Sequence, residues 1–310
     1  MAGERRNPLT VALIGCGRWG RLILRDLRAL GCEVVVIDPS SEGVQHAHDG
    51  GAVRMADRID EIRDVDGVVV ATPASSHAEV VRAVLSLEVP IYVEKPITVD
   101  PDQAERLARA APSTLFVMDK WRYHPAVGVL RDIATGGELG AVTGLATRRE
   151  QWGNPHPDTD PVWTLAPHDL VIAHEILGDL PEPRSAVLER SNGATLGMTA
   201  ILGAEPWVAL SVSGARPETH RSVHAFFEDG VAWFEGGWAD HVLVARAESV
   251  AGEPERREAT GELPLLAELR AFVGHLRGGP PPLSDAATGA RVVRMIADLR
   301  GLAAEPGSRT

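Results

Sequence analysis

Short apolar runs alternate with amphipathic segments over the first 120 residues, and this alternation constrains the fold more than any other feature of the sequence. The runs are continuous and rich in β-branched residues, which is typical of strands buried on both faces. Five are strong and one is weaker: residues 9–15, 33–38, 67–72, 91–95 and 114–119, and residues 52–56. The segments between them have helical spacing, so we predict a doubly wound α/β domain whose parallel sheet is covered by helices on both faces.

The pattern changes after residue 121. Longer runs alternate apolar and polar residues, as half-buried strands do, and Asp229-Gly230 marks a hairpin turn between two of them. One helix is predicted here, from Pro167 to Leu177, so a large, mainly antiparallel sheet would keep an open face. We expect a first domain over residues 1–121, rejoined by a C-terminal helix at residues 284–304, and an α+β domain over residues 122–283.

Composition excludes several classes of protein. The formal charge is -12 with acids and bases mixed, which leaves no basic stripe for a nucleic acid backbone. Cys16 and Cys32 form no CxxC pair, so we expect neither disulfides nor a metal site, and a reducing cytoplasm fits. No apolar stretch approaches the about 20 residues of a membrane span, and no signal-peptide core precedes the first strand. The charged, aperiodic stretch at residues 251–262 predicts an exposed loop.

A glycine motif joins the first strand to the first helix. Gly15, Gly17 and Gly20 have the GxGxxG spacing of a dinucleotide-binding turn. Gly15 would allow the tight turn, Gly17 the close approach of a pyrophosphate, and Gly20 the packing of helix on sheet. The alternative is a strand-to-helix turn that binds nothing. We predict a Rossmann domain, and Arg18 and Trp19 within the motif are assigned to the cofactor site.

Asp38 predicts which dinucleotide is bound. It ends the second strand 18 residues after Gly20, close to the spacing of about 20 expected for the acid that binds the adenosine ribose hydroxyls. A carboxylate there repels a 2'-phosphate, so NAD is favoured over NADP. The alternative is that Asp38 only caps the next helix.

Polar residues also follow two later strands. Thr72, Pro73 and His77 come after one strand, and Glu94 and Lys95 after the next, so all five lie at the carboxyl edge of the sheet, where open α/β folds bind ligands. We assign all five to the cofactor site. For His77, an exposed position in the first turn of a helix is the alternative.

Lys95 is the strongest catalytic candidate in the first domain. Pro96 fixes φ directly after it and prevents a helix from starting there. A lysine at this edge can bind a substrate hydroxyl or, with its pKa lowered by burial, share in proton transfer. The alternative is a surface ion pair between Glu94 and Lys95.

Four segments together resemble the Gfo/Idh/MocA family of NAD(P)-dependent oxidoreductases: GCGRWG, ATPASSHAE, VEKPIT and WRYHPAVGVL, in this order. The resemblance spans most of the chain, and EKP is its most specific element. It implies that Lys95 is catalytic, between a Rossmann domain and an open-faced sheet domain. It also implies self-association, because family members commonly pair sheet to sheet.

The family carries an Asp-x-x-x-His element in the second domain, whose histidine exchanges a proton with the substrate. By this resemblance His168 is the second catalytic residue, and Thr164 stands where the aspartate would be. Thr164 and the adjoining Asp169 are assigned to the substrate site with His168. WTLAPHDL also resembles a branch whose members act on nucleotide-linked or antibiotic sugars. The alternative is that His168 and Asp169 only cap a helix that begins at Pro167.

Further substrate contacts are predicted near the boundary between the domains. Lys120, Arg122 and Tyr123 surround Trp121, and such a mixture of charged donors and aromatic faces suits polyol recognition. Trp152 ends a predicted strand and is assigned to the substrate site as well. For Trp121 itself, packing between domains is the preferred role.

We therefore predict an NAD-dependent oxidoreductase that transfers a hydride between nicotinamide and a secondary alcohol or ketone of a sugar or nucleotide sugar. One alternative is a cyclitol dehydrogenase. Another is an NAD(P)-binding regulator without turnover, which Thr164 would favour. The predicted partners are the small-molecule substrate and further copies of the chain, as a homodimer or homotetramer, with no nucleic acid, membrane or metal.

Overall fold

The computed structural model describes residues 8–249 and 252–304, which form two compact units. Unit 1 holds the described chain up to Asp119 together with Leu265–Ala290. Unit 2 holds Lys120–Pro264 and the described chain from Arg291 onward. Residues 1–7, on which part of the expectation about a signal peptide rests, lie outside the described residues.

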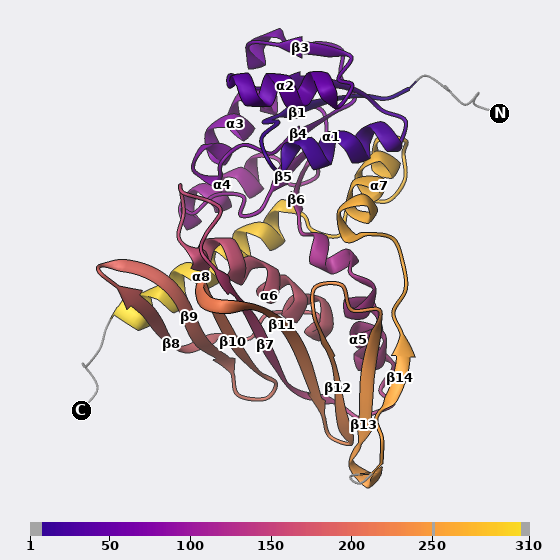
Figure 1. Cartoon of the computed structure of the whole chain (residues 1–310), viewed down its shortest axis with the longest axis vertical. Helices are drawn as coiled ribbons and strands as arrows, with labels where there is room; N and C mark the ends of the chain where they lie inside the picture. Colours follow the sequence, from indigo (N-terminus) through magenta and orange to yellow (C-terminus); the bar gives the residue numbers. More distant parts are fainter. Residues whose placement is uncertain (1–7, 250–251, 305–310) are drawn as a thin grey trace, which may run out of the picture. The chain divides into compact units, whose positions relative to one another are not determined.

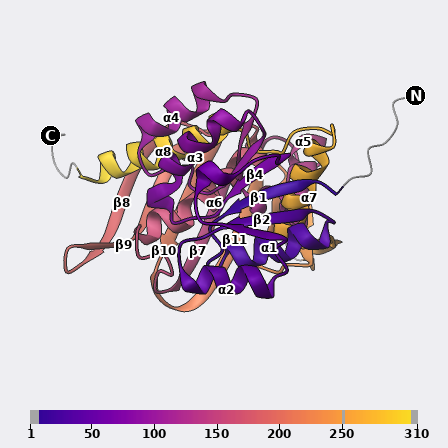
Figure 2. The same ribbon diagram turned by 90° about the horizontal axis from the view of Figure 1, so that it is seen from above.

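Unit 1 is built on a six-stranded parallel sheet in the order β3-β2-β1-β4-β5-β6 (Figure 1). Its strands are β1 (Thr10–Ile14), β2 (Glu33–Ile37), β3 (Arg54–Ala56), β4 (Gly67–Val70), β5 (Ile91–Glu94) and β6 (Leu115–Met118). Helices cover both faces: α1 (Gly20–Ala29), α2 (Ser41–Asp49), α3 (His77–Val84) and α4 (Pro101–Ala110). Figure 2 shows α1 and α2 on one side of this sheet and α3 and α4 on the other. The prediction of a doubly wound Rossmann domain is confirmed.

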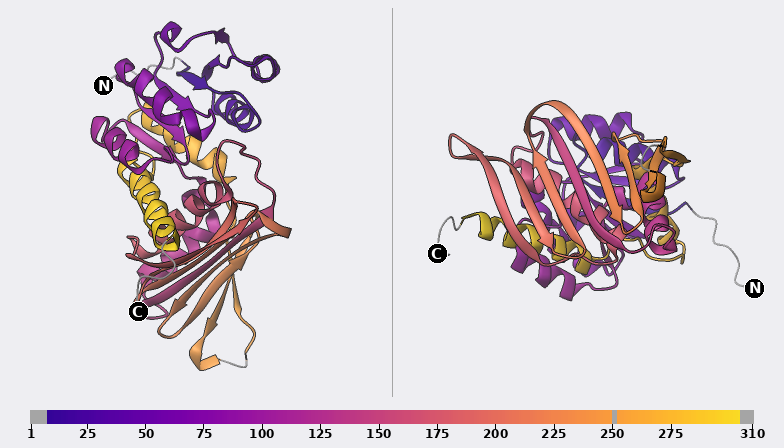
Figure 3. Two further views of the ribbon diagram at one scale, coloured as in Figure 1. Left: turned by 90° about the vertical axis from the view of Figure 1, so that its left-hand side faces the viewer. Right: turned by 90° about the horizontal axis from the view of Figure 1, so that it is seen from below.

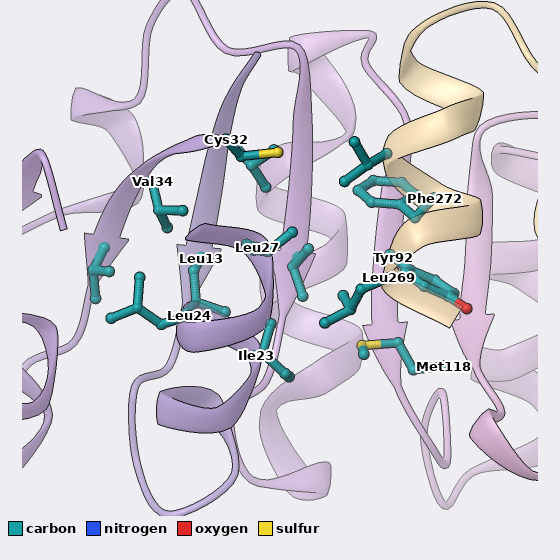
Figure 4. Close-up of a cluster of buried hydrophobic side chains, with 14 of the residues drawn as sticks. Leu13, Ile23, Leu24, Leu27, Cys32, Val34, Tyr92, Met118, Leu269 and Phe272 are labelled. Carbon is teal, nitrogen blue, oxygen red and sulfur yellow. The ribbon is translucent and has the colours of Figure 1, made fainter. Parts of the chain in front are cut away.

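The core of unit 1 includes a helix from the C-terminal part of the chain. Leu269 and Phe272 of α7 (Pro264–Leu276) pack with Leu13, Leu27 and Tyr92 (Figure 4). The Tyr92 and Phe272 rings stack with their centroids 4.9 Å apart. Apolar packing therefore draws residues 265–290 into unit 1, whereas the sequence suggested a return only at residues 284–304. Helix α8 (Ala286–Ala304) begins in unit 1 and continues in unit 2.

Unit 2 is built on an eight-stranded sheet in the order β14-β13-β12-β11-β7-β10-β9-β8. Its strands are β7 (Val142–Trp152), β8 (Pro183–Ser191), β9 (Ala194–Gly203), β10 (Trp207–Ser213), β11 (Ala215–Phe227), β12 (Gly230–Glu235), β13 (His241–Arg246) and β14 (Glu255–Glu258). Among the described strand pairs of this sheet, only β7 with β10 is parallel, so the predicted, mainly antiparallel sheet is confirmed. Phe227 pairs with Gly230, which confirms the predicted hairpin.

One face of this sheet carries two helices of unit 2, α5 (Pro125–Gly136) and α6 (Pro161–Leu177). Figure 3 shows that no helix of the described chain covers the other side, which we call the open face. The open face carries the side chains of Trp207, Phe226 and Trp233. Their neighbours along the strands, Val208, Ala225 and Phe234, are buried on the face that carries the helices. Trp207 and Phe226 pack with their ring centroids 5.2 Å apart.

Helix α6 begins six residues earlier than predicted, at Pro161 instead of Pro167. Asp160 is its N-cap and accepts a hydrogen bond of 3.0 Å from the amide of Val162. Pro167 lies inside the helix, where a proline removes one donor, and here it does not end the helix. His168 and Asp169 are therefore interior helical residues, and the alternative that they cap the helix is wrong.

The charged stretch at residues 251–262 is not wholly a loop. It contains β14, which pairs with β13, although residue 251 lies outside the described residues. Arg257 of β14 forms an ion pair with Glu138, so charge pairing holds this polar strand at the sheet edge. Within the described chain, no helix is both long enough and apolar enough to cross a bilayer.

Candidate functional site

The glycine turn of unit 1 has the shape that a dinucleotide phosphate needs. Gly15 has a φ of +93°, and a Cβ there would lie 2.7 Å from the carbonyl carbon of Ala71. A Cβ on Gly20 would overlap the carbonyl oxygen of Gly15. A Cβ on Gly17 would meet nothing within 4 Å, so the fold itself does not require this glycine. The open space beside Gly17 favours a pyrophosphate site over the alternative, which is a turn that binds no ligand.

The N-terminus of α1 supports the same interpretation. Within the described residues no side chain caps this helix, and its first turn holds no acid. The amide groups and the partial positive charge at a helix N-terminus favour an anion. Arg18 and Trp19 lie in the glycine turn just before α1, where Arg18 is exposed and Trp19 is half-buried.

Asp38 is held beside the glycine turn by several donors. Its Oδ2 accepts from the amide of Cys16 at 2.7 Å, and its Oδ1 accepts from the amide and the hydroxyl of Ser40 at 2.8 and 2.6 Å. Ser40, not Asp38, caps α2 by accepting from the amide of Gly43 at 3.0 Å. The alternative that Asp38 only caps this helix is therefore wrong. The carboxylate has a fixed orientation at the position expected for ribose recognition.

His77 has a task that the sequence did not reveal. Its side chain is buried, with 1% exposure, so the alternative of an exposed first-turn residue is wrong. Its Nδ1 lies 2.7 Å from the carbonyl oxygen of Pro96, and its Nε2 lies 2.8 Å from that of Thr72. Both ring nitrogens lie within hydrogen-bonding distance of backbone carbonyls, and a neutral imidazole can donate to one of the two. The assignment of His77 to the cofactor site stays a prediction. Thr72 and Pro73 remain half-exposed at the sheet edge.

Lys95 lies in a turn that is held through its neighbour Glu94. The indole N–H of Trp19 donates to Glu94 Oε1, and the amide of Lys95 donates to Glu94 Oε2 at 3.1 Å. The Lys95–Pro96 peptide bond is cis. Lys95 is half-buried, and Pro96 after it is buried. Both carboxylate oxygens of Glu94 thus take part in the turn, which a simple surface ion pair would not explain.

The scarcity of lysine is a sequence signal that the motif analysis missed. Of the 31 lysines and arginines, only two are lysines, Lys95 and Lys120. Lys95 follows β5, and Lys120 follows β6, the neighbouring strand. Arginine cannot lose its proton in a protein, whereas lysine can and is also the more compact cation. The chain uses arginine elsewhere and has lysine at two positions predicted to contact substrate. This distribution suggests that the chemistry of lysine is needed at these positions.

In unit 2, His168 lies on α6 next to a buried ionic and aromatic cluster. The centroid of the His168 ring is 6.4 Å from that of the Trp121 ring. The guanidinium of Arg149 lies over the same Trp121 ring, 4.2 Å from its centroid. Trp121 also stacks on His124 at 5.0 Å. Burial lowers the pKa of His124 to about 4, so this imidazole is neutral near pH 7.

Asp169 belongs to this cluster and not to a substrate site. Its carboxylate accepts three hydrogen bonds from Arg149, at 2.9, 3.0 and 3.1 Å. Burial raises the pKa of Asp169, and the guanidinium of Arg149 opposes this effect. Asp169 is 1% exposed, which corrects its assignment to substrate binding. The pair instead fixes the part of α6 that carries His168.

Thr164 has a structural contact where the family aspartate would stand. Its hydroxyl donates to Asn154 Oδ1 at 3.1 Å and lies 3.3 Å from the carbonyl oxygen of Asp160. Asn154 in turn donates to the carbonyl oxygens of His156 and Thr159. Thr164 therefore attaches the loop at residues 153–160 to α6, one helical turn before His168.

The remaining substrate candidates have different surroundings. Arg122 donates to Glu175 at 2.7 Å, and Arg131 shares the same carboxylate, so Arg122 has a structural contact that sequence reasoning did not foresee. Trp152 is 76% exposed at the end of β7. Lys120 and Tyr123, in the 3-10 helix Lys120–Tyr123, are half-buried. No cluster of His, Cys, Asp and Glu among the described residues could hold a metal ion.

Comparisons with known proteins identify relatives of the chain. Residues 9–117 match the family GFO_IDH_MocA, described as an oxidoreductase family with an NAD-binding Rossmann fold. UDP-N-acetylglucosamine 3-dehydrogenase of Acidithiobacillus ferrooxidans is 26% identical over 307 residues, which cover 94% of this chain and 96% of that protein. Inositol 2-dehydrogenase of an Arthrobacter species is 37% identical over 111 residues, which cover 34% of this chain and 33% of that protein.

Solved structures agree with the fold. A crystal form of the Acidithiobacillus ferrooxidans enzyme superposes with a TM-score of 0.84 at 24% identity, covering 96% of this chain and 99% of that chain. Levoglucosan dehydrogenase in complex with NADH and levoglucosan superposes with a TM-score of 0.85 at 17% identity, covering 96% of this chain and 98% of that chain. The two-unit architecture described above is therefore shared with sugar dehydrogenases of known structure.

Proposed function

We propose that this chain is a member of the Gfo/Idh/MocA family of oxidoreductases and that it moves a hydride between NAD and a secondary alcohol or ketone of a nucleotide-linked sugar. The proposal rests on the carboxyl edge of the sheet in unit 1. There the glycine turn, with Asp38 bound to its backbone, lies beside the turn in which Glu94 binds the amide of Lys95. The substrate class rests on the relative that is similar over nearly the whole chain, a UDP-sugar dehydrogenase.

Four features of unit 1 would hold the cofactor. The backbone at Gly17 and the amides at the start of α1 would bind the pyrophosphate, and Asp38 would bind the adenosine ribose hydroxyls. Thr72 and Pro73 would border the nicotinamide half, since they follow β4 at the same edge. When bound, the cofactor supplies hydride acceptance and donation, and the protein supplies orientation and proton transfer.

Lys95 and His168 are proposed to act on one substrate oxygen. In the oxidising direction the C–H bond of the carbinol would break, the hydride would carry its electron pair to NAD, and the hydroxyl proton would pass to His168 as the C=O bond forms. Lys95 would donate a hydrogen bond to the same oxygen and stabilise the negative charge that develops there. Reduction of the ketone uses the same groups in reverse.

A second candidate is a cyclitol dehydrogenase. The identity to inositol 2-dehydrogenase is higher, at 37%, but it covers only 34% of this chain. The UDP-sugar dehydrogenase is similar over 94% of the chain, which includes the unit that carries His168. We therefore favour the nucleotide sugar.

We further propose that the chain self-associates through the open face. Trp207, Phe226 and Trp233 are large apolar residues that this face leaves half-exposed. Exposed apolar patches of this kind usually mark interfaces, and a second copy offers the same complementary surface.

One experiment tests the proposed reaction. The purified protein would be incubated with NAD and, separately, with UDP-sugars, the matching free sugars and inositols, while nicotinamide absorbance is followed. The proposal expects reduction of NAD with a UDP-sugar and much slower reduction with its free sugar. Fast turnover of an inositol would favour the cyclitol alternative, and NAD binding without turnover of any member of the panel would favour a regulator.

A further inference from the structure

The turn that carries Lys95 is attached to other segments of unit 1 both before and after the lysine. Glu94, before the lysine, is bound by Trp19, and Pro96, after it, is bound by His77. Lys95 itself therefore lies between two residues that other segments hold in place. We call Trp19 and His77 the turn clamp.

Trp19 connects the lysine turn to the glycine turn. Its indole N–H donates to Glu94 Oε1, and the other carboxylate oxygen accepts from the amide of Lys95 at 3.1 Å. A hydrogen bond to a carboxylate is stronger than one between neutral groups. The Trp19 ring is half-buried and packs against the apolar core, so the donor has little freedom to turn away.

His77 connects the lysine turn to the end of β4. Its two ring nitrogens lie 2.7 Å from the carbonyl oxygen of Pro96 and 2.8 Å from that of Thr72. A neutral imidazole donates from one nitrogen only, and the doubly protonated ring donates from both. Since the ring is buried, its loss would leave the Pro96 carbonyl without this donor.

We propose that Trp19 and His77 are positioning residues that fix the Lys95 amine for catalysis from opposite sides of its turn. The inference rests on the proposed function of Lys95, but the clamp has a physical consequence of its own. Without it, the turn gains freedom and the amine becomes more accessible to solvent. A displacement of about 1 Å at a reacting group can cost up to about a hundredfold in rate.

The scarcity of lysine makes the clamp measurable without a substrate. Lys95 and Lys120 are the only lysines of the sequence, so the labelling of each by a limiting succinimidyl ester can be followed by peptide mass spectrometry. Lys120 serves as the internal control in the same molecule. Trp19→Phe removes the indole N–H while keeping an aromatic ring in the core, and Trp238→Phe, at a residue that is 78% exposed, is the matched control.

The expected result is that Trp19→Phe raises the labelling rate of Lys95 several-fold and leaves that of Lys120 unchanged. Trp238→Phe should change neither rate. His77→Asn should raise the Lys95 rate as well, with the exposed His48→Asn as its control. Because Trp19 and Glu94 share one hydrogen bond, Glu94→Gln should raise the Lys95 rate less in the Trp19→Phe variant than in the wild-type protein.

Turnover of a confirmed substrate gives the second readout. Trp19→Phe should lower kcat by about 10- to 100-fold while KM for NAD changes far less. If Trp19→Phe leaves both the Lys95 labelling rate and kcat at the wild-type values, the clamp is refuted, whether or not His77→Asn folds. If labelling rises but no substrate is ever turned over, the clamp stands and the proposed reaction fails.

Discussion

Replacing Asp169 by asparagine should strongly destabilise unit 2, because it removes one partner of a buried ion pair. Asp169 and Arg149 are 1% and 3% exposed and share three hydrogen bonds. A second guanidinium is also near: burial and, to a smaller extent, the charge of Arg149 lower the pKa of Arg221 and the charge of Asp169 opposes them, so that the pKa is about 10. In the variant, Arg149 would keep its charge with no carboxylate to balance it.

The size of the effect follows from this geometry. Asparagine has nearly the volume of aspartate, so no cavity forms and the loss is electrostatic. Breaking one side of a buried pair typically costs about 3–5 kcal/mol. For a unit of this size, each kcal/mol lowers Tm by about 2–4 °C, so Asp169→Asn should lower the Tm of unit 2 by about 6–20 °C.

Differential scanning calorimetry of the variant is the assay, and two further variants make it specific. Asp60→Asn breaks an exposed pair with Arg58 and should leave Tm unchanged. The double variant Arg149→Met with Asp169→Leu removes both members of the buried pair and should recover most of the loss. A Tm within about 2 °C of wild type for Asp169→Asn would refute the reasoning, as would a double variant less stable than the single one.

Other predictions test other parts of the molecule. The wild-type protein should bind NADH more tightly than NADPH, because the fixed carboxylate of Asp38 repels a 2'-phosphate, and tighter binding of NADPH in a titration would contradict this. Since the pKa of His124 falls from 6.5 to about 4 on folding, the unfolded chain binds more protons between these values. The free energy of unfolding should therefore decrease as pH falls from about 6.5 to 4, by up to about 3 kcal/mol more than in His124→Asn, and equal slopes in denaturant titrations would contradict this. Phe226→Glu on the open face should reduce a larger assembly to a mass near 33.1 kDa in light scattering, and a wild-type protein already at that mass would contradict self-association.

The sequence predicted the elements whose residues follow a strong local rule. The strands of unit 1 are continuous β-branched runs because both faces are buried, and the hairpin at Asp229-Gly230 has a turn sequence. β14 was missed because it consists of charged residues held by pairing with β13 and with Glu138. The start of α6 was misplaced because Pro167 resembles a first helical residue, whereas Asp160 and Pro161 form the actual start.

The site was predictable where spacing along the chain dictates position, and not where partners are distant. Gly15, Gly20 and Asp38 could be assigned because one turn and one strand end define them. Asp169 was misassigned because its partner Arg149 comes from another element, β7, 20 residues earlier. For His77, no local rule shows that a polar side chain is buried between two carbonyls of separate loops.

Turnover by alanine variants tests the central claim most directly. If Lys95 and His168 act on one substrate oxygen, Lys95→Ala and His168→Ala should each lower kcat by about a hundred- to ten-thousand-fold, the usual contribution of an acid/base group, with NADH affinity close to wild type. Lys95→Arg should lower kcat too, because a guanidinium retains the charge but cannot reproduce the compact amine. If both alanine variants turn over a confirmed substrate at the wild-type rate, Lys95 and His168 are not the catalytic residues.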